Sequence, residues 1–258
     1  MLRPRIIPVL LIHNKGLIKT VNFNKEKGKY VGDPINAVRI FNEKEADELM
    51  VLDIDATVLK KEPNYDLIEK LANECRMPLC YGGGIKTKEQ AQRIFSYGVE
   101  KIAVSSSAVE NPNIISDLAS IVGKQSVVVV VDVKKRLLGG YDIYTHNATK
   151  KHRIKLEEFI VRIQELGVGE IVLNSIDNDG VMSGYDFKLV DRIKPLVHVP
   201  LTVLGGAGNM NDIKDLINNF GSIGCAAGSI FVFKGKYRAV LINYPSWDER
   251  EEIGKVGL

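Results

Sequence analysis

Two stretches of the chain repeat the same order of motifs: CYGGGIKTKEQAQRIFSYGVEKIAVSSSAV at 80–109 and TVLGGAGNMNDIKDLINNFGSIGCAAGSIF at 202–231. Each starts with an apolar strand, passes through a glycine-rich turn into a helical segment, and returns as a strand followed by a small-residue turn. An aspartate-bearing strand end precedes each, LDID at 52–55 and NSIDNDG at 174–180. The pattern predicts a two-fold repeat of half-barrels; chance similarity of glycine-rich turns is the alternative.

The rest of the chain extends this alternation of strands and helices. Helical segments such as 33–47, 87–98 and 155–167 carry cap signals or end at glycine. The strand-like runs are nearly continuous in Val, Ile and Leu, as parallel strands buried on both faces require. There are eight: Arg5–Ile12, Leu49–Asp53, Pro78–Tyr81, Lys101–Val104, Ser126–Val133, Glu170–Asn174, Leu201–Leu204 and Ser222–Ala226. They predict a single (β/α)8 barrel domain over residues 1–258, with a doubly wound open sheet as the alternative.

Composition narrows the class of protein. Hydrophobic residues make up 45% and charged residues 26%, and the net charge of +3 with scattered lysines argues against nucleic-acid binding. Cys75, Cys80 and Cys225 lack metal-site spacing, so we expect reduced thiols in a cytoplasmic protein. The N-terminus is a poor signal peptide, and no run is long enough to span a membrane. No motif indicates a metal or another cofactor.

Glycine-rich and small-residue turns follow four of the predicted strands. Backbone N–H groups at such turns can approach an anion closely, which predicts phosphate binding; turn geometry alone is the alternative. Two sites on opposite sides of one barrel mouth suit a substrate with a phosphate at each end. The predicted phosphate-binding residues are Gly82, Gly83, Ser105 and Ser106 for one site, and Asp179, Gly180, Gly205, Gly206, Gly228 and Ser229 for the other.

Acids also collect at the strand ends, where catalytic groups converge in barrels. Asp132, at the end of an apolar strand, is the sharpest candidate for acid–base work, because burial should raise its pKa; a carboxylate that caps a loop is the alternative. The segment 14–32 is long for a strand-to-helix loop. We expect it to form a lid from which Lys19 reaches an anion, rather than a solvated loop.

Charged residues stand near four strand starts: Arg5, Glu48, Lys101 and Glu170. Charged residues at strand starts are commonly exposed to solvent at the N-terminal end of a barrel. Their spacing in the sequence does not show that these four contact one another.

The chain resembles the cyclase subunit of imidazole glycerol phosphate synthase over essentially its whole length. The matching stretches are RII at 5–7, DELMVLDID at 47–55, GGGI at 82–85, EKIAVSSSAVENP at 100–112, VVVVVDVKK at 127–135, GEIVLNSIDNDGVMSGYD at 169–186 and GGAG at 205–208. The resemblance implies a barrel that pairs, at its N-terminal face, with a glutaminase subunit. Ammonia would enter there and react at the top with a substrate carrying two phosphates. The resemblance also assigns Arg5, Glu48, Lys101 and Glu170 to a salt-bridged ammonia gate.

Several positions depart from the family pattern. The first of two catalytic aspartates falls on Leu11, which breaks the acid–base pair, while Asp132 matches the second. Asp55 stands where threonine is usual, Ser105 where asparagine is usual, and Leu204 where serine is usual.

Three functions follow from this pattern. The leading hypothesis is a paralogue with impaired or altered cyclase chemistry. It supplies ammonia to a separate sugar amidotransferase that forms acetamidino groups in surface glycans. The second is a histidine-pathway cyclase in which Asp55 or His13 replaces the lost acid. The third is a binding barrel that neither conducts ammonia nor catalyses.

Overall fold

The structure, a computed structural model, describes residues 4–256. Its central feature is a closed ring of eight parallel strands: β1 (Arg5–His13), β4 (Leu49–Asp53), β5 (Leu79–Gly82), β6 (Lys101–Val104), β7 (Val127–Lys135), β10 (Glu170–Ser175), β11 (Leu201–Leu204) and β12 (Gly224–Ala227). Strand β1 pairs with both β4 and β12, and β7 pairs with both β6 and β10, so the ring has no free edge. The predicted barrel is confirmed.

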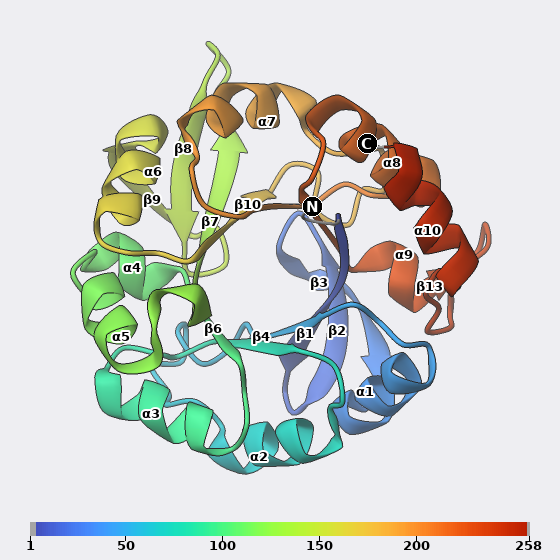
Figure 1. Cartoon of the computed structure of the whole chain (residues 1–258), viewed down its shortest axis with the longest axis horizontal. Coiled ribbons are helices and arrows are strands. Elements are labelled where there is room, and N and C mark those ends of the chain that lie inside the picture. Colours follow the sequence, from blue (N-terminus) through green and yellow to red (C-terminus); the bar gives the residue numbers. More distant parts are fainter. Residues whose placement is uncertain (1–3, 257–258) are drawn as a thin grey trace.

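Helices surround this ring (Figure 1). They are α1 (Pro34–Glu43), α2 (Tyr65–Glu74), α3 (Lys88–Ser96), α4 (Ser106–Glu110), α5 (Ile114–Val122), α6 (Leu156–Glu165), α7 (Phe187–Ile193), α8 (Met210–Phe220), α9 (Ser229–Val232) and α10 (Trp247–Val256). The predicted caps are present: Asp33 accepts from the Asn36 N–H, and Thr87 and Gln90 form a capping box.

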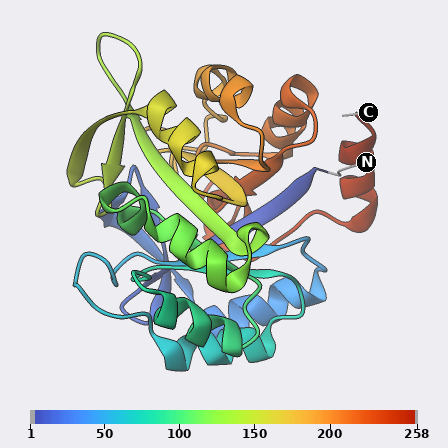
Figure 2. The same cartoon turned by 60° about the vertical axis from the view of Figure 1, so that its left-hand side comes forward.

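Two antiparallel hairpins interrupt the strand–helix alternation. The first, β2 (Gly16–Val21) and β3 (Asn24–Gly32), follows β1; the second, β8 (Tyr141–Thr145) and β9 (Lys150–Lys155), follows β7. The segment 14–32, expected to be a loop, is therefore mostly a β-hairpin. In Figure 2 the light-green turn between β7 and β8 projects at the upper left beyond the helices. Because β1 and β7 are the first and fifth barrel strands, the hairpins occupy matching places in the two half-barrels.

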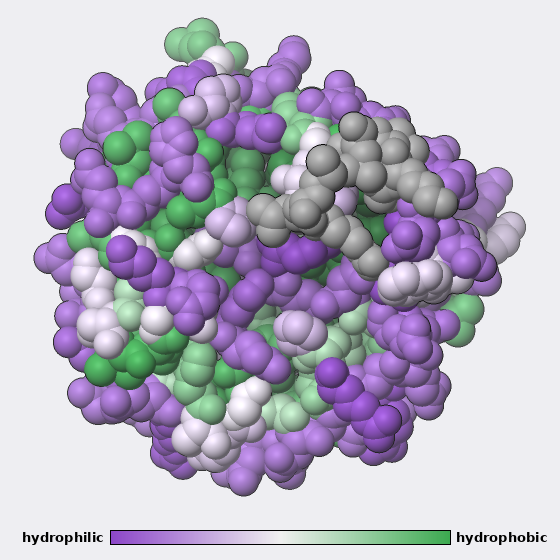
Figure 3. Space-filling view, viewed as in Figure 1, coloured by the Kyte–Doolittle hydropathy of each residue, from purple (hydrophilic) through white to green (hydrophobic). Residues whose placement is uncertain are grey.

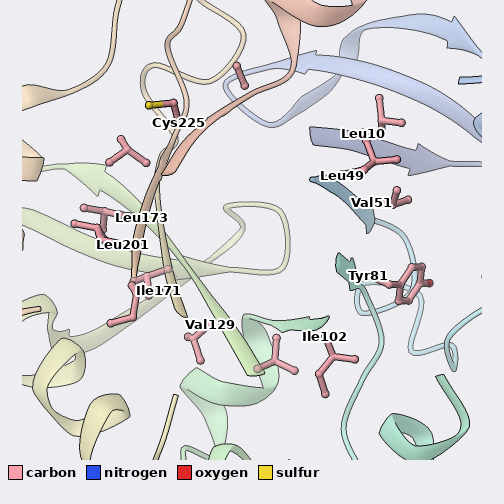
Figure 4. Packing of buried hydrophobic residues seen from close by; sticks show 14 of the residues in the cluster. Leu10, Leu49, Val51, Tyr81, Ile102, Val129, Ile171, Leu173, Leu201 and Cys225 are labelled. Carbon is pink, nitrogen blue, oxygen red and sulfur yellow. The ribbon is translucent and has the colours of Figure 1, made fainter. Parts of the chain in front are cut away.

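Side chains along each barrel strand point alternately outward and inward, so the core has two layers. Outward side chains such as Leu10, Val51 and Val129 pack beneath the helices (Figure 4). Inward side chains form a separate cluster that fills the middle of the barrel: Ile7, Val9, Met50, Cys80, Ala103, Val128, Val130, Val172, Leu204 and Ala226. The barrel interior is thus apolar in its middle, and the polar inward positions lie at its two ends.

A short hairpin, β13 (Phe233–Lys234) and β14 (Ala239–Val240), precedes the C-terminal segment. None of the helices within 4–256 is long and apolar enough to cross a membrane.

Candidate functional site

A closed ring of charges lies at the N-terminal end of the barrel. Arg5 contacts Glu48 at 2.6 Å and Glu170 at 2.8 Å, and Lys101 contacts the same carboxylates at 2.7 and 2.9 Å. Thr202 donates to Glu170 at 2.6 Å. The four charged residues predicted from the strand starts therefore meet, and each cation bridges both acids.

The ring favours the charged forms of Lys101 and Glu170. Glu48 and Glu170 are only 4% and 3% exposed. Burial by itself would raise the pKa of Glu170, but the hydrogen bond and the charge of Arg5, together with Lys101, hold it below its usual range. The pKa of Lys101 is raised by the two glutamates despite its burial. Figure 3, drawn from this side, shows hydrophilic residues gathered at the centre of the face.

The opposite end of the barrel holds a pocket whose walls are the C-terminal strand ends and the loops that follow them. Its floor is apolar and is made by Val9, Ala103, Val130 and Leu204 of the inner cluster. Its polar wall residues come from different segments: Lys19, Thr20, Asp53, Thr57, Lys86, Ser105, Ser106, Ser107, Glu110, Asp132, His146, Asn147, Asn174 and Asp179.

Asp132 is the most strongly perturbed acid of this pocket. Asn174 donates to its Oδ1 at 2.8 Å, and Ser105 donates to its Oδ2 at 3.2 Å. Burial raises its pKa to about 7, although both hydrogen bonds act in the opposite direction. A carboxyl group that titrates near neutrality can give or take a proton at working pH.

Leu11 faces this acid from across the pocket. It lies near the end of β1, it packs on the inner cluster, and β1 and β7 are the first and fifth of the eight strands. The β1 wall of the pocket is therefore aliphatic at Leu11, and the other acid nearby on this side is Asp53 at the end of β4, whose pKa is raised by burial.

Lys19 lies in strand β2 rather than in a loop, and its side chain is 7% exposed. Its ammonium group contacts Asp179 Oδ1 at 2.7 Å, and Thr20 donates to Oδ2 at 3.4 Å. The Lys19 stem also crosses Gly228, where a Cβ would lie 3.0 Å from its Cε. The charge predicted to reach an anion is thus paired with an acid beside the second small-residue turn.

The two predicted phosphate sites differ in how they meet the pocket. Gly82, Gly83, Ser105 and Ser106 of the first all line it. Of the second, Asp179 and Gly228 line it, whereas Gly180, Gly205, Gly206 and Ser229 do not. The turns demand glycine: at Gly83, with φ of +121°, a Cβ would lie 2.4 Å from the Asp53 carbonyl oxygen.

Asp55 lies outside this pocket. Its carboxylate contacts His13 Nδ1 at 2.8 Å and Lys25 Nζ at 2.5 Å, and it accepts from the Asn14 N–H at 3.0 Å. Burial would raise its pKa, but these bonds, led by that from Lys25, lower it to about 2. The structure therefore ties Asp55 and His13 into a cluster that joins the first hairpin to the loop after β4, instead of bringing them beside Asp132.

Sequence reasoning missed several pocket residues, among them Asn174, His146 and Asn147. Asn174 contacts Asp132 from the neighbouring strand, and its position, four residues after Glu170 on the same inward face, could have revealed it. His146 and Asn147 sit in the β8–β9 turn, where Asn147 donates to the Ile54 carbonyl at 2.8 Å. No strand-end pattern marks them, since the hairpin brings them over the pocket.

Within residues 4–256, no group of three or more His, Cys, Asp or Glu side chains is arranged to hold a metal ion.

Comparison with known proteins gives one consistent family. The family described as "Histidine biosynthesis protein" matches residues 5–238. Two relatives carry provisional names as imidazole glycerol phosphate synthase subunits. Subunit hisF3 of Vibrio vulnificus is 62% identical over 98% of this chain and 96% of its own length, and subunit HisF of Leptospira borgpetersenii is 59% identical over 98% and 99%. Subunit HisF of the same synthase from Alkaliphilus metalliredigens is 37% identical over 90% and 91%. The chain belongs to the histidine biosynthesis protein family, as a barrel of the imidazole glycerol phosphate synthase HisF type.

Proposed function

We propose that this chain is the ammonia-conducting subunit of a glutamine amidotransferase complex and that it has lost the cyclase reaction. A glutaminase subunit docks at the N-terminal face, and ammonia passes the charged ring and the apolar interior to the pocket. A separate amidotransferase then uses it to convert an acetamido sugar to its acetamidino form. The observation that carries the proposal is the combination of a complete ring with Leu11 opposite Asp132.

The path is chemically suited to ammonia. The ring presents fixed, alternating charges that are fully paired among themselves, so it offers no site for a stray ion. The inner cluster above it is apolar, and it includes the small side chains of Ala103, Ala226 and Cys80. Neutral ammonia enters such a medium at far lower cost than ammonium, whose charge would need a partner there.

The pocket argues against cyclisation but not against a phosphorylated ligand. Proton transfer at two positions needs two groups in reach of the substrate, and leucine can neither give nor take a proton. The turn formed by Gly82, Gly83, Ser105 and Ser106 still borders the pocket. We therefore expect the first phosphate site to bind a phosphorylated molecule, while the bond-forming chemistry occurs in the partner enzyme.

The comparisons support a separate lineage. Identity is 52% or higher to four relatives with provisional names, and 36–37% to four relatives named without qualification as HisF subunits.

The second candidate is a cyclase of histidine biosynthesis, and Asp132 favours it, because a carboxyl with a pKa near neutrality is what acid–base catalysis uses. Neither Asp55 nor His13 replaces the first aspartate, since Asp55 is engaged by His13 and Lys25 outside the pocket. A barrel that only binds ligands would have no use for the complete ring.

Complementation of a histidine auxotroph lacking its own cyclase separates these functions. We expect the wild-type gene to fail and the Leu11→Asp variant to restore measurable growth. Expression is checked by immunoblot, and Leu11→Asn, which is polar but cannot exchange a proton at neutral pH, is the matched control. Growth with the wild-type gene at the rate of a genuine cyclase would overturn the proposal. A second test is turnover of the two-phosphate ribulosyl aminoimidazole substrate with ammonium salts, for which we expect no product.

A further inference from the structure

The turn between β7 and β8 carries two leucines that bury no surface. Leu137 and Leu138 are 106% and 102% exposed, as in an extended peptide. The turn that bears them projects beyond the helices (Figure 2). A single exposed leucine is ordinary on a protein surface, but two adjacent, fully exposed leucines at a projecting tip are typical of a contact site for a partner.

The backbone of this tip does not need the leucines. The Arg136 N–H donates to the Gly140 carbonyl at 2.9 Å, and the Gly139 N–H donates to the Arg136 carbonyl at 3.2 Å. Gly139 and Gly140 have φ of +88° and +81°, a region that glycine enters without strain. Small polar residues are the usual choice between such positions, so the leucines have no local structural reason.

Positive charge adjoins the leucines. Lys134 and Lys135 are exposed, and no described side chain forms an ion pair with either. Asp142, the register partner of Lys134, is held by Lys151 at 2.7 Å, and Arg136 approaches it only to 3.8 Å. The surface that complements this tip is therefore an apolar cleft bordered by aspartate or glutamate side chains.

A second loop at the same end of the barrel has the same combination. After β4, Val58 and Leu59 are 41% and 52% exposed, and two exposed lysines follow at 60–61. Thr57, which precedes them, lines the pocket. Apolar and basic surface thus reaches from this loop to the rim of the pocket.

The second hairpin connects the leucine tip with this rim. Its β8–β9 turn lines the pocket at His146 and Asn147, and Asn147 donates to the carbonyl of Ile54 in the loop after β4. The five-residue strand β8 between that turn and the tip spans roughly 17 Å. One partner with an interface of ordinary size, about 800 Å² on each side, can therefore contact the tip and the 58–61 loop while it covers the pocket.

We propose that Leu137 and Leu138, with the basic residues beside them, form the docking site for the amidotransferase that receives the ammonia. The inference rests on the proposed function, which assigns the glutaminase to the N-terminal face. Ammonia released from an uncovered pocket would diffuse into water, so the receiving enzyme needs a contact on the C-terminal face. The tip and the 58–61 loop supply that contact to an acidic, apolar cleft.

The test measures binding between purified proteins. The complex of the barrel with its glutaminase is titrated calorimetrically with the acetamido-sugar amidotransferase of the same organism. We expect the double variant Leu137→Ser, Leu138→Ser to raise the Kd at least about 10-fold. Leu137→Met, Leu138→Met keeps the apolar surface and is the matched control, with a Kd within about 2-fold of wild type. Because both leucines are fully exposed, all three barrels should have the same melting temperature.

A charge-reversed variant tests the basic residues. Lys134→Glu, Lys135→Glu should weaken binding and make the Kd less sensitive to salt than that of wild type. An unchanged Kd in this variant would contradict the acidic border assigned to the partner.

Other occupants of the tip are outcomes of the same experiment. A barrel dimer that the serine variant dissociates would overturn the proposal in favour of a second copy. Binding to vesicles of phosphatidylethanolamine and phosphatidylglycerol, lost in the serine variant, would overturn it in favour of a membrane surface. No binding of the amidotransferase, or equal binding to the serine variant, would also overturn it. Glutamine-dependent amidination by the three proteins together is measured separately, so the proposed function can hold where this docking site fails.

Discussion

Arg5 and Leu11 lie on the same inward face of strand β1, one at each end of the barrel interior. Arg5 closes the charged ring with Glu48 and Glu170, whereas Leu11 packs on the apolar cluster beneath the pocket. Because side chains of a strand alternate between faces, the inward positions of this strand read Arg5, Ile7, Val9 and Leu11 from one end to the other. One strand therefore carries a residue of the charged ring at one end and a leucine, in place of an acid, at the other.

The ring should contribute strongly to stability through Glu170. Replacing Glu170 by Ala leaves Arg5 and Lys101 with one acid between them, so we expect the free energy of unfolding to fall by about 3 kcal/mol. Urea denaturation at pH 7 measures this. The matched control is Glu158→Ala, which removes an exposed pair with Lys155 and should leave the free energy of unfolding nearly unchanged. Similar losses in both variants would contradict the prediction.

The same carboxylate sets a pH dependence. The pKa of Glu170 is held below its ordinary value of 4.5, so the unfolded chain binds its proton more readily than the folded chain. The stabilisation is therefore complete above about pH 4.5 and is lost as the pH falls through the lowered pKa. We expect the difference in unfolding free energy between wild type and Glu170→Gln to shrink on acidification below that pH. A difference that grows on acidification would show that the ring is not held by this charge.

The contribution of Asp132 to folding stability should depend on pH in the opposite direction. Its pKa is raised from 3.8 to about 7, so the folded protein holds the proton that the unfolded chain releases. Ionisation therefore costs stability progressively between about pH 4 and pH 7. We compare the free energy of unfolding of Asp132→Asn with that of wild type at pH 8 and at pH 4. The difference should shift in favour of the variant by about 2–4 kcal/mol between pH 4 and pH 8. Urea titrations at the two pH values measure this, and an equal difference at both would count against a raised pKa.

The sequence was sufficient for the barrel strands but not for the hairpins. Three of the eight predicted runs, 49–53, 101–104 and 201–204, have the observed bounds, because strands buried on both faces must be apolar throughout. Strand β3 is mostly exposed and rich in lysine, and it is a strand only because it pairs with β2. Such a segment carries no apolar period that single-sequence reasoning could detect.

In the candidate site, too, some features could be predicted from the sequence and others could not. Asp132 could be selected because it interrupts an apolar run. The contact between Lys101 and Glu170, 69 residues apart, arises only when the barrel closes, and local spacing cannot report it. The engagement of Asp55 by His13 and Lys25 likewise depends on where the first hairpin lies. Residue types at strand ends were thus predictable, whereas their pairing was set by tertiary structure.

Lys19 and Asp179 should behave as a coupled buried pair. Both side chains are less than a tenth exposed, so removing one leaves the other charge without its partner. We expect Lys19→Met alone to cost about 3 kcal/mol, and the double variant Lys19→Met, Asp179→Leu to cost less than the sum of the single changes. Urea denaturation of all four proteins gives the coupling energy. Simple additivity would mean that the contact contributes nothing in solution.

The glycine-rich turn after β11 offers a test of backbone geometry. Gly206 has φ of +119°, and a Cβ on it would lie 2.1 Å from the Gly184 carbonyl oxygen, so Gly206→Ala meets both strain and a backbone clash. We expect a loss of at least about 3 kcal/mol in unfolding free energy. Gly221→Ala is the matched control: its φ is +72°, and no atom lies within 4 Å of the added Cβ. Strain alone should cost it about 1 kcal/mol. If both variants lost the same amount, the close approach of the 184 and 206 backbones would not exist in solution, and the turn behind the second phosphate site would have to be looser than it is here.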